Sequence, residues 1–254
     1  MKRATIAALL LFPFALPSSP DELKSFRDLQ WKYPRVRAAS KEKDEVLKQR
    51  FKEKGVAYPP RAILLRGFKK EAVLELWATD EEDKPFVLIH KYSICTSSGT
   101  LGPKRRFGDE QVPEGFYELD WFNPQSNFYL SLHISYPNAA DRILGSHQNL
   151  GGDIFLHGDC ASIGCIPITD DGIREVYWLA VLVHNQNQQH LPIHIFPTRL
   201  TDDGFQALAG THPNVPGLLA FWSNLKQGHD LFEKTHRLPR FKTHADGTYV
   251  FSAF

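Results

Sequence analysis

The sequence has few cysteines, a single methionine and almost no net charge. Its 254 residues carry 30 lysines and arginines against 29 aspartates and glutamates, a formal net charge of +1. A nucleic-acid-binding surface needs a basic excess or a basic stripe, so no nucleic-acid partner is expected. Three cysteines are too few for a disulfide framework, and an odd number leaves at least one thiol unpaired within the chain.

Long apolar runs are also scarce, and the one at the N-terminus is short. Lys2 and Arg3 precede an uncharged run over residues 4–16, which is followed by prolines and small residues. This pattern is typical of a secretory signal. A stable membrane span is not expected, because crossing a bilayer takes about 20 apolar residues. We predict a signal peptide at residues 1–19, with a buried first helix as the alternative. Oxidising compartments favour disulfides, whereas an enzyme would keep one thiol free as a nucleophile.

What is present is enough to build a core, since 42% of the residues are apolar and 12% aromatic. Residues 20–60 are polar and helix-prone, with a break at Pro34 and a stop at Gly55. They predict a helical lead-in, and a substrate-sensing arm is the less favoured interpretation.

From Arg61 onward the pattern changes to short apolar runs bounded by turn residues, including turns at Gly67 and at 80–83. A helix is expected after Cys165, capped within 169–171, and helices with a last strand at 248–251 are expected in the C-terminal extension, 199–254. The predicted fold is mainly β (α+β): a sandwich or barrel-like core flanked by helical N- and C-terminal extensions. The expected core strands lie at 62–65, 72–77, 86–89, 115–119, 129–134, 153–157 and 192–196.

The segment that carries chemistry runs from an apolar strand into a short loop. His157 and Gly158 end the strand, and Ser162, Gly164 and Cys165 follow within eight residues of the histidine. A cysteine attacks as the thiolate, a nearby histidine can take its proton, and backbone N–H groups beside a glycine can hold an oxyanion. A buried cysteine beside a satisfied core histidine is the alternative for an isolated pair.

This segment resembles the active-site motif of the L,D-transpeptidase catalytic domain (YkuD-type), which reads His-Gly and then Ser-x-Gly-Cys. The resemblance covers roughly residues 61–198. The spacing of eight and the Tyr-Pro-Asn block are similar to the subgroup of periplasmic murein transpeptidases and the related enzyme that detaches lipoprotein from peptidoglycan. Further matching blocks are Gly102-Pro103-Lys104, Gly108-Asp109, Pro113 to Tyr117, Ser135 to Asn138, Asp141-Arg142 and Gly151 to Ile154.

The resemblance implies a periplasmic enzyme, without cofactor or metal, that acts on peptidoglycan stem peptides, with a peptidoglycan-linked lipoprotein as a further candidate partner. Cys165 would attack the L-centre carbonyl of a tetrapeptide stem and expel the terminal D-alanine, with His157 as general base. The thioester would then pass to an amine or to water. Loop support would come from Gly158, Ser162 and Gly164, with Ser162 orienting the loop or His157, or equally a plain turn hydroxyl.

Substrate contacts are expected from Tyr136, Asn138 and Arg142, although Tyr-Pro-Asn is equally a turn signal. Many members of the family carry an arginine two residues after the nucleophile, where this chain has Pro167. That departure leaves the holder of the substrate carboxylate open, with Lys104, Arg105 and Arg142 as the candidates. It also leaves a wall-binding protein without catalysis as an alternative function.

The remaining cysteines and histidines have less favoured roles. Cys160 could form a reversible disulfide with Cys165, in a redox protein or as an inactivating device, but a small neutral loop residue is the preferred interpretation. Cys95 is expected to be a buried strand residue. A metal pair at His190 and His194 is disfavoured, because Pro192 between them prevents a shared helical face.

Overall fold

The structure is a computed structural model that describes residues 25–82, 84–146, 149–186 and 188–252. The predicted signal peptide at 1–19 lies outside these residues. Within them, no helix is both long and apolar enough to cross a membrane. The helices are α1 (Phe26–Trp31), α2 (Pro34–Glu53), α3 (Ala139–Leu144), α4 (Thr169–Asn185), α5 (Asp202–Thr211) and α6 (Leu218–Thr235). The strands are β1 (Ala62–Phe68), β2 (Val73–Thr79), β3 (Val87–Ser93), β4 (Gly115–Asn123), β5 (Ser131–Ile134), β6 (Phe155–His157), β7 (Ile166–Pro167), β8 (Leu191–Phe196), β9 (Arg240–Thr243) and β10 (Tyr249–Ser252).

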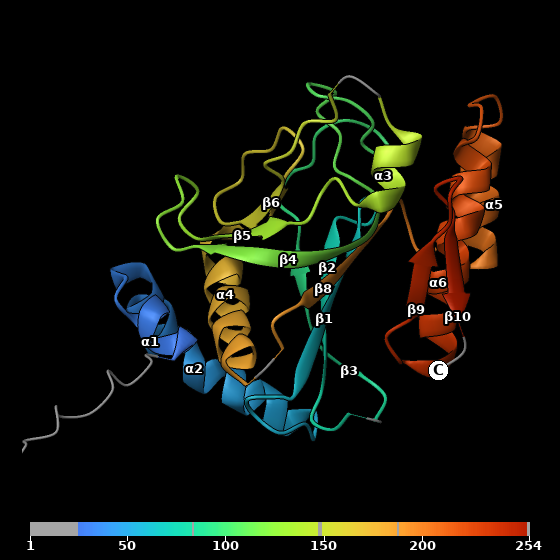
Figure 1. Ribbon diagram of the computed structural model, residues 1–254. Helices are drawn as coiled ribbons and strands as arrows, with labels where there is room; N and C mark the ends of the chain where they lie inside the picture. Colours follow the sequence, from blue (N-terminus) through green and yellow to red (C-terminus); the bar gives the residue numbers. More distant parts are fainter. Residues whose placement is uncertain (1–24, 83, 147–148, 187, 253–254) are drawn as a thin grey trace, which may run out of the picture.

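Eight strands form one sheet in the order β3-β2-β1-β8-β4-β5-β6-β7. Neighbours are antiparallel except for the β1/β8 and β6/β7 pairs, which are parallel. The sheet curls strongly, so that β4 and β5 cross the direction of β1, β2 and β8 (Figure 1). The barrel-like core of the prediction is therefore one curled sheet, and its β6–β7 end carries the histidine and the cysteine.

Both faces of the sheet are covered, as the alternation along β1 shows. Ile63 and Leu65 belong to the large core that α4 shares, whereas Leu64 and Phe68 lie in separate clusters on the opposite face. A strand that is buried on both faces has a continuous apolar sequence. This explains the run Ala-Ile-Leu-Leu at the start of β1.

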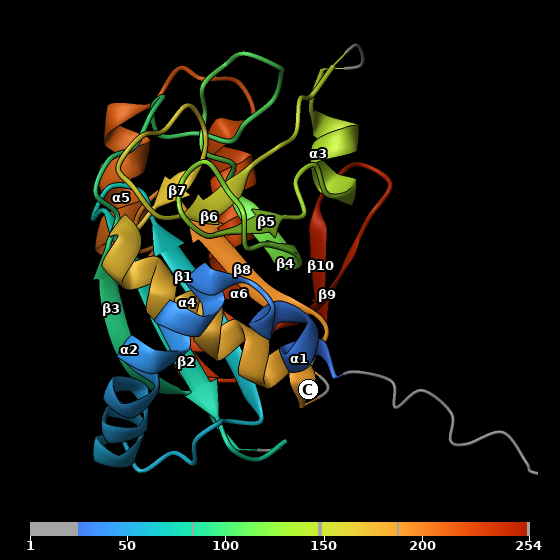
Figure 2. The ribbon, with the colours of Figure 1, turned by 90° about the vertical axis from the view of Figure 1, so that its left-hand side faces the viewer.

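The first face is covered by α4, against which α1 and α2 pack from outside (Figure 2). Val36, Leu47 and Phe51 of α2 are fully buried in the same core as the sheet. Pro34 opens α2, where its missing N–H costs nothing. The lead-in therefore contributes to the main core.

The opposite face is covered by α6 and the β9/β10 hairpin, in the C-terminal extension (Figure 1). Trp222 of α6 is fully buried there. Arg66 of β1 is also fully buried and pairs with Glu233 of α6 at 2.8 Å, with its guanidinium 4.3 Å from the centre of the Phe232 ring. An ion pair and a cation–π contact thus attach α6 to the sheet.

The α+β class, the helix after the cysteine and the helical extensions at both ends are confirmed, although more residues lie in helices than in strands. The turn predicted at Gly67 is wrong. Gly67 lies inside β1, paired with Leu74 of β2. The chain turns instead over the charged segment 69–72, where Ala72 adopts a positive φ of 51°.

Candidate active site

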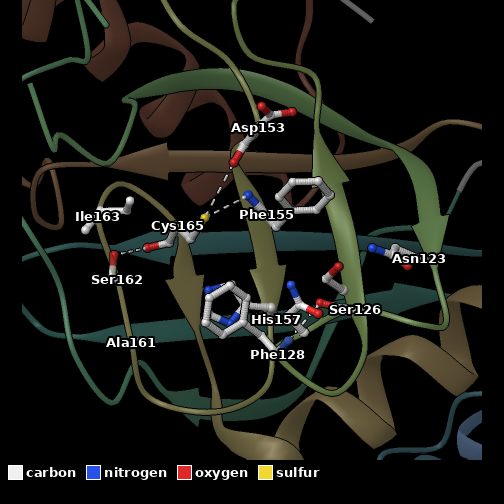
Figure 3. A pocket seen from close by; sticks show the side chains of 12 residues that line it. Asn123, Ser126, Phe128, Asp153, Phe155, His157, Ala161, Ser162, Ile163 and Cys165 are labelled. Carbon is white, nitrogen blue, oxygen red and sulfur yellow. Dashed lines mark hydrogen bonds between the residues drawn. The ribbon is translucent and has the colours of Figure 1, made fainter. Parts of the chain in front are cut away.

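A cavity of about 440 Å³ opens at the β6–β7 end of the sheet (Figure 3). Its walls come from the ends of three strands, from the loop between β4 and β5, and from the loop between β6 and β7. The residues that line it are Asn123, Ser126, Asn127, Phe128, Ser131, Asp153, Phe155, His157, Ala161, Ser162, Ile163 and Cys165.

Strand register explains why these residues meet. Asn123 of β4 pairs with Ser131 of β5, which pairs with His157 of β6. Because side chains alternate along a strand, the neighbouring row faces the opposite side. That row is Phe122, Leu132, Leu156 and Ile166, all in the main core. The same core row therefore fixes which side chains face the cavity.

Cys165 is the free cysteine of the chain. It precedes β7, so its side chain lies beside Phe155 of β6. The Phe155 N–H donates to Sγ at 3.4 Å, and the thiol lies 3.7 Å from the carbonyl oxygen of Asp153. Burial, assisted by the negative charge of Asp153, raises the pKa of Cys165 above its ordinary value of 9.0, against smaller lowering effects of the Phe155 N–H and Lys104. The Cys165 side chain is therefore a neutral thiol.

His157 is buried, with its ring stacked 4.6 Å from that of Phe128. Nδ1 bonds the carbonyl oxygen of Gly158, and since a carbonyl only accepts, Nδ1 carries the proton. Nε2 then holds a lone pair, and it has no hydrogen-bond partner among the described residues. Burial also lowers the pKa of His157 below 6.5. The imidazole is thus neutral and has a free acceptor nitrogen, as a general base requires.

The loop between β6 and β7 is held by Ser162. Its Oγ donates to the carbonyl oxygen of Cys165 at 2.8 Å, accepts from the Gly164 N–H at 3.2 Å and lies 3.2 Å from Oγ of Ser98. Ser162 therefore shapes the loop rather than orienting His157. The Gly164 N–H, a predicted oxyanion donor, is engaged by Ser162 in this state.

Two glycines of the motif are required by space and conformation. A Cβ on Gly158 would lie 2.5 Å from Oδ1 of Asp170 and 2.9 Å from the carbonyl oxygen of Phe128. Gly164 has a φ of +127°, and its Cβ would lie 3.1 Å from the carbonyl oxygen of Gln111. Side chains at either position would push the histidine or the cysteine out of place.

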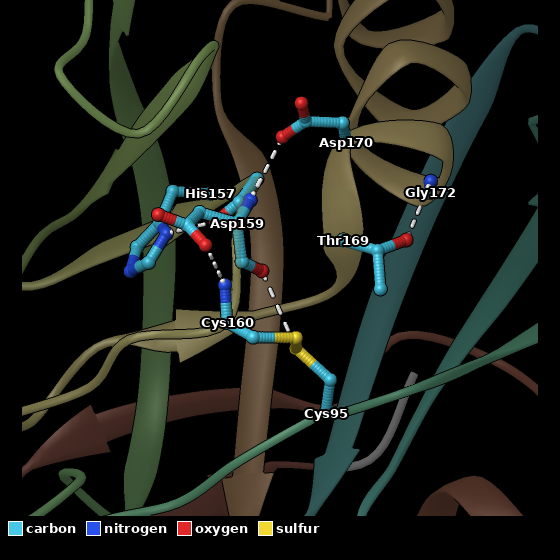
Figure 4. Close-up of a disulfide and its surroundings, with 8 residues drawn as sticks. Cys95, His157, Asp159, Cys160, Thr169, Asp170 and Gly172 are labelled. Atoms are coloured by element: carbon cyan, nitrogen blue, oxygen red, sulfur yellow. Dashed lines mark hydrogen bonds between the residues drawn. A yellow bond between two sulfur atoms is a disulfide. The ribbon is translucent and has the colours of Figure 1, made fainter.

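A disulfide joins Cys95 to Cys160, and this corrects two predictions (Figure 4). Cys95 is not a buried strand residue, because it follows the end of β3 and is exposed. Cys160 is neither a small neutral residue nor the partner of Cys165, since Cys95 takes up its thiol. The bond anchors the loop next to the nucleophile, and a backbone hydrogen bond from Cys95 N–H to the Pro167 carbonyl oxygen reinforces it at 3.1 Å.

The predicted substrate contacts lie outside the cavity. Tyr136 is buried and donates to the carbonyl oxygens of Lys104 and Leu150. Asn138 caps α3 and donates to Tyr249 of β10 at 2.8 Å. Arg142 is exposed on α3. The Tyr-Pro-Asn block thus acts as a turn and cap.

The predicted carboxylate holders are engaged elsewhere. Lys104 pairs with Asp109 at 2.5 Å, and Arg105 pairs with Asp141 at 2.9 Å. Among the described residues that line the cavity there is no lysine or arginine. The cavity offers a carboxylate the neutral side-chain donors Asn123, Ser126, Asn127 and Ser131, whereas the hydroxyl of its third serine, Ser162, already donates to the Cys165 carbonyl oxygen. The sequence did not reveal these donors, because the pairing of β4 with β5 and the loop between them bring them to the cysteine.

The loop between β3 and β4, whose Gln111 carbonyl lies beside Gly164, is tied to the C-terminal extension. The buried Lys69 ammonium donates to the carbonyl oxygens of Gly102 and Val112, and pairs with Glu114 at 2.9 Å. The second oxygen of Glu114 accepts from the indole N–H of Trp222 at 2.8 Å. Removing one partner of such a pair leaves an uncompensated buried charge, which costs about 3–5 kcal/mol.

The histidine pair of the disfavoured metal site is split. His194 is buried in β8, 4.8 Å from the Phe116 ring, and His190 is exposed and bonds Glu118. In the part of the chain that the structure describes, no group of three or more histidine, cysteine or acidic residues is placed to hold a metal ion.

Comparison with known proteins identifies the family. No family model matches the chain. The "Putative L,D-transpeptidase YafK" of Escherichia coli K12 is 35% identical over 192 residues, which cover 75% of this chain and 74% of that protein. The chain belongs to the L,D-transpeptidase family. The same relative from Escherichia coli O157:H7 matches with equal values.

Among solved structures, the chain is similar to the helical cell shape determining protein Pgp2 of Campylobacter jejuni, with a TM-score of 0.42 and 16% identity over 72% of this chain and 73% of that one. For Mycobacterium tuberculosis L,D-transpeptidase 1 the TM-score is 0.31 and the identity 14%, over 53% and 62% of the two chains.

Proposed function

We propose that this L,D-transpeptidase family member transfers the acyl group of a peptidoglycan tetrapeptide stem through a thioester on Cys165, in the periplasm of a bacterium. The observation that carries the proposal is the pairing within one cavity of a free, neutral thiol and a histidine whose Nε2 lone pair has no partner. The N-terminal run with the pattern of a secretory signal supports export.

The first half-reaction forms the thioester. Nε2 of His157 takes the proton of the Cys165 thiol as sulfur attacks the L-centre carbonyl of the stem, and a tetrahedral oxyanion forms. When the C–N bond breaks, His157 returns the proton to the departing amine of D-alanine. General-base attack suits two groups that burial keeps neutral at rest.

The second half-reaction returns the enzyme. An amine, from another stem or a protein lysine, attacks the thioester, gives its proton to His157, and displaces the sulfur, which regains a proton as the free thiol. Water in the same place would give hydrolysis. The leaving D-alanine carboxylate would be held by the amides and hydroxyls of the cavity, since Pro167 stands where an arginine occurs in many relatives.

The test is product analysis. Purified protein is incubated with disaccharide-tetrapeptides, and the products are weighed by mass spectrometry. D-alanine release with dimers or exchanged amino acids supports transfer, whereas free tripeptide stems assign water as acceptor. Cys165→Ala and His157→Gln are expected to abolish release, and Gln49→Ala on the exposed side of α2 is the matched control. Unchanged substrate, or release that survives Cys165→Ala, contradicts the proposal. A carbapenem adduct confined to proteins that retain Cys165 checks the thiol independently.

A further inference from the structure

A row of aromatic side chains, which ends at the exposed Trp121, leads away from Cys165. By register, Trp121 of β4 pairs with His133 of β5, and His133 pairs with Phe155 of β6, the residue beside Cys165. Both other rings contact Phe155: the ring centre of His133 lies 5.1 Å from that of Phe155, and the ring centre of Trp121 lies 5.9 Å from it.

The row lies on the same face of the sheet as the cavity and extends it. Trp121 and Asn123 are two residues apart on β4, so they share a face, and Asn123 lines the cavity. Trp121 is 54% exposed. Because its ring contacts Phe155, which lines the cavity, this exposed indole makes the apolar lining of the cavity continue onto the surface.

Polar groups stand at the edge of this aromatic surface. Nδ1 of His133 bonds Oδ1 of Asp120 at 2.6 Å, and the Asp120 side chain is 43% exposed. A flat, electron-rich indole face with a carboxylate at its rim suits a pyranose ring, whose C–H groups pack on the face while its hydroxyl and amide groups bond the rim.

The length of the row fits the stem. At the backbone, Cys165 and Trp121 are three strand spacings apart, about 14 Å, and the indole ring leans from there toward the ring of Phe155. The leaving group is one residue, which reaches about 4 Å and stays short of Trp121. The three residues on the acyl side span up to about 11 Å, so the next unit along the donor, the sugar that carries the stem, comes within reach of the indole between the β4 backbone and Phe155.

On the basis of the proposed function, we infer that Trp121, with His133 and Phe155, forms a subsite for the N-acetylated sugar ring to which the acyl-donor stem is attached. Trp121 is then a specificity residue, and the donor is a glycan-borne stem rather than a free peptide.

The kinetic test compares a disaccharide-tetrapeptide with the same tetrapeptide without sugar. In Trp121→Ala, the ratio of kcat/KM for the sugar-bearing to the free substrate is expected to fall about tenfold, through KM for the sugar-bearing substrate. Trp121→Phe keeps a ring and should retain most of the ratio, which also guards against a misfolded alanine variant. The control is Trp31→Ala, because Trp31 is 43% exposed on α1, away from the row. An unchanged ratio in Trp121→Ala overturns the inference.

Binding separates this inference from the proposed function. Calorimetry on Cys165→Ala should show the disaccharide-tetrapeptide binding about tenfold more tightly than the free tetrapeptide, with the difference lost on adding Trp121→Ala. Equal affinities for the two peptides overturn the sugar subsite. That result is also the one expected if the aromatic row contacts a protein acceptor instead of the sugar. If the wild type turns over neither substrate, the proposed function fails, and the binding comparison still decides the subsite.

Discussion

The disulfide between Cys95 and Cys160 gives the sharpest stability prediction. It closes a loop of 65 residues between the end of β3 and the loop that precedes the nucleophile. In the chain-entropy description, closing a loop of that size restricts the unfolded chain by about 4 kcal/mol at 25 °C. Both cysteines are exposed, so replacing them leaves no core cavity. The double variant Cys95→Ser/Cys160→Ser should therefore unfold with about 4 kcal/mol less free energy than the wild type.

The assay is urea unfolding followed by tryptophan fluorescence at pH 6, where thiol exchange is slow. With a denaturant slope of about 2.5 kcal/mol/M, the midpoint should fall by about 1.5 M. Wild type that is first reduced with dithiothreitol at pH 8 and then assayed at pH 6 should unfold at the same midpoint, and the same treatment should leave the double variant unchanged. Folded-state geometry near the cysteine should persist, since Cys95 N–H still bonds Pro167 and Asp159 N–H still bonds Asp170 at 2.8 Å. A midpoint shift under 0.4 M, or about 1 kcal/mol, would refute the reasoning.

Three further predictions concern the site and its surroundings. Gly158→Ala should destabilise the fold by about 1–3 kcal/mol through overpacking and lower kcat/KM more than tenfold, whereas Gly152→Ala, whose Cβ meets nothing within 4 Å, should change neither; equal unfolding midpoints would contradict this. The alkylation rate of Cys165 by iodoacetamide should keep rising to above pH 9, because burial raises the pKa of the thiol; a plateau near pH 6 would instead reveal a thiolate–imidazolium pair. Burial lowers the pKa of His194 from 6.5 to about 3, so the unfolded chain binds the proton first and stability falls as pH drops from 6.5 toward 3. Relative to His194→Leu, the wild type should lose about 4 kcal/mol between pH 7.5 and 3.5 in urea titrations, and parallel curves would contradict the assignment.

The local sequence pattern predicted the histidine and the cysteine at the centre of the site. The other residues of the site are brought there by pairing between segments that are distant in the sequence. His157 ends β6 and Cys165 directly precedes β7, its paired neighbour, so one short segment sets their relation. Cys95 pairs with a residue 65 positions away, which spacing alone does not reveal. Asn123 and Ser131 reach the cavity because of the β4/β5 register, and that register shifts between Leu119 and Trp121.

The residue type at a single position predicted local structure and function less dependably than strand pairing did. Gly67 is a turn residue by type but a strand residue in fact, because the apolar run at 62–65 and Phe68 commit β1 to the buried sheet. Tyr136 and Asn138 stand in a motif shared with the family, yet their polar atoms bond the backbone and Tyr249. Whether a motif residue touches substrate or supports the fold depends on side-chain direction, which sequence does not give.

The shared carboxylate of Glu114 has a consequence for how related sequences diverge. One oxygen receives Lys69 and the other receives the indole N–H of Trp222. A change at any one of these positions leaves a buried polar group without its partner, so we expect the three to be inherited or replaced together. Grafting the C-terminal segment of one homologue onto another would then succeed only when the residue at position 114 travels with it.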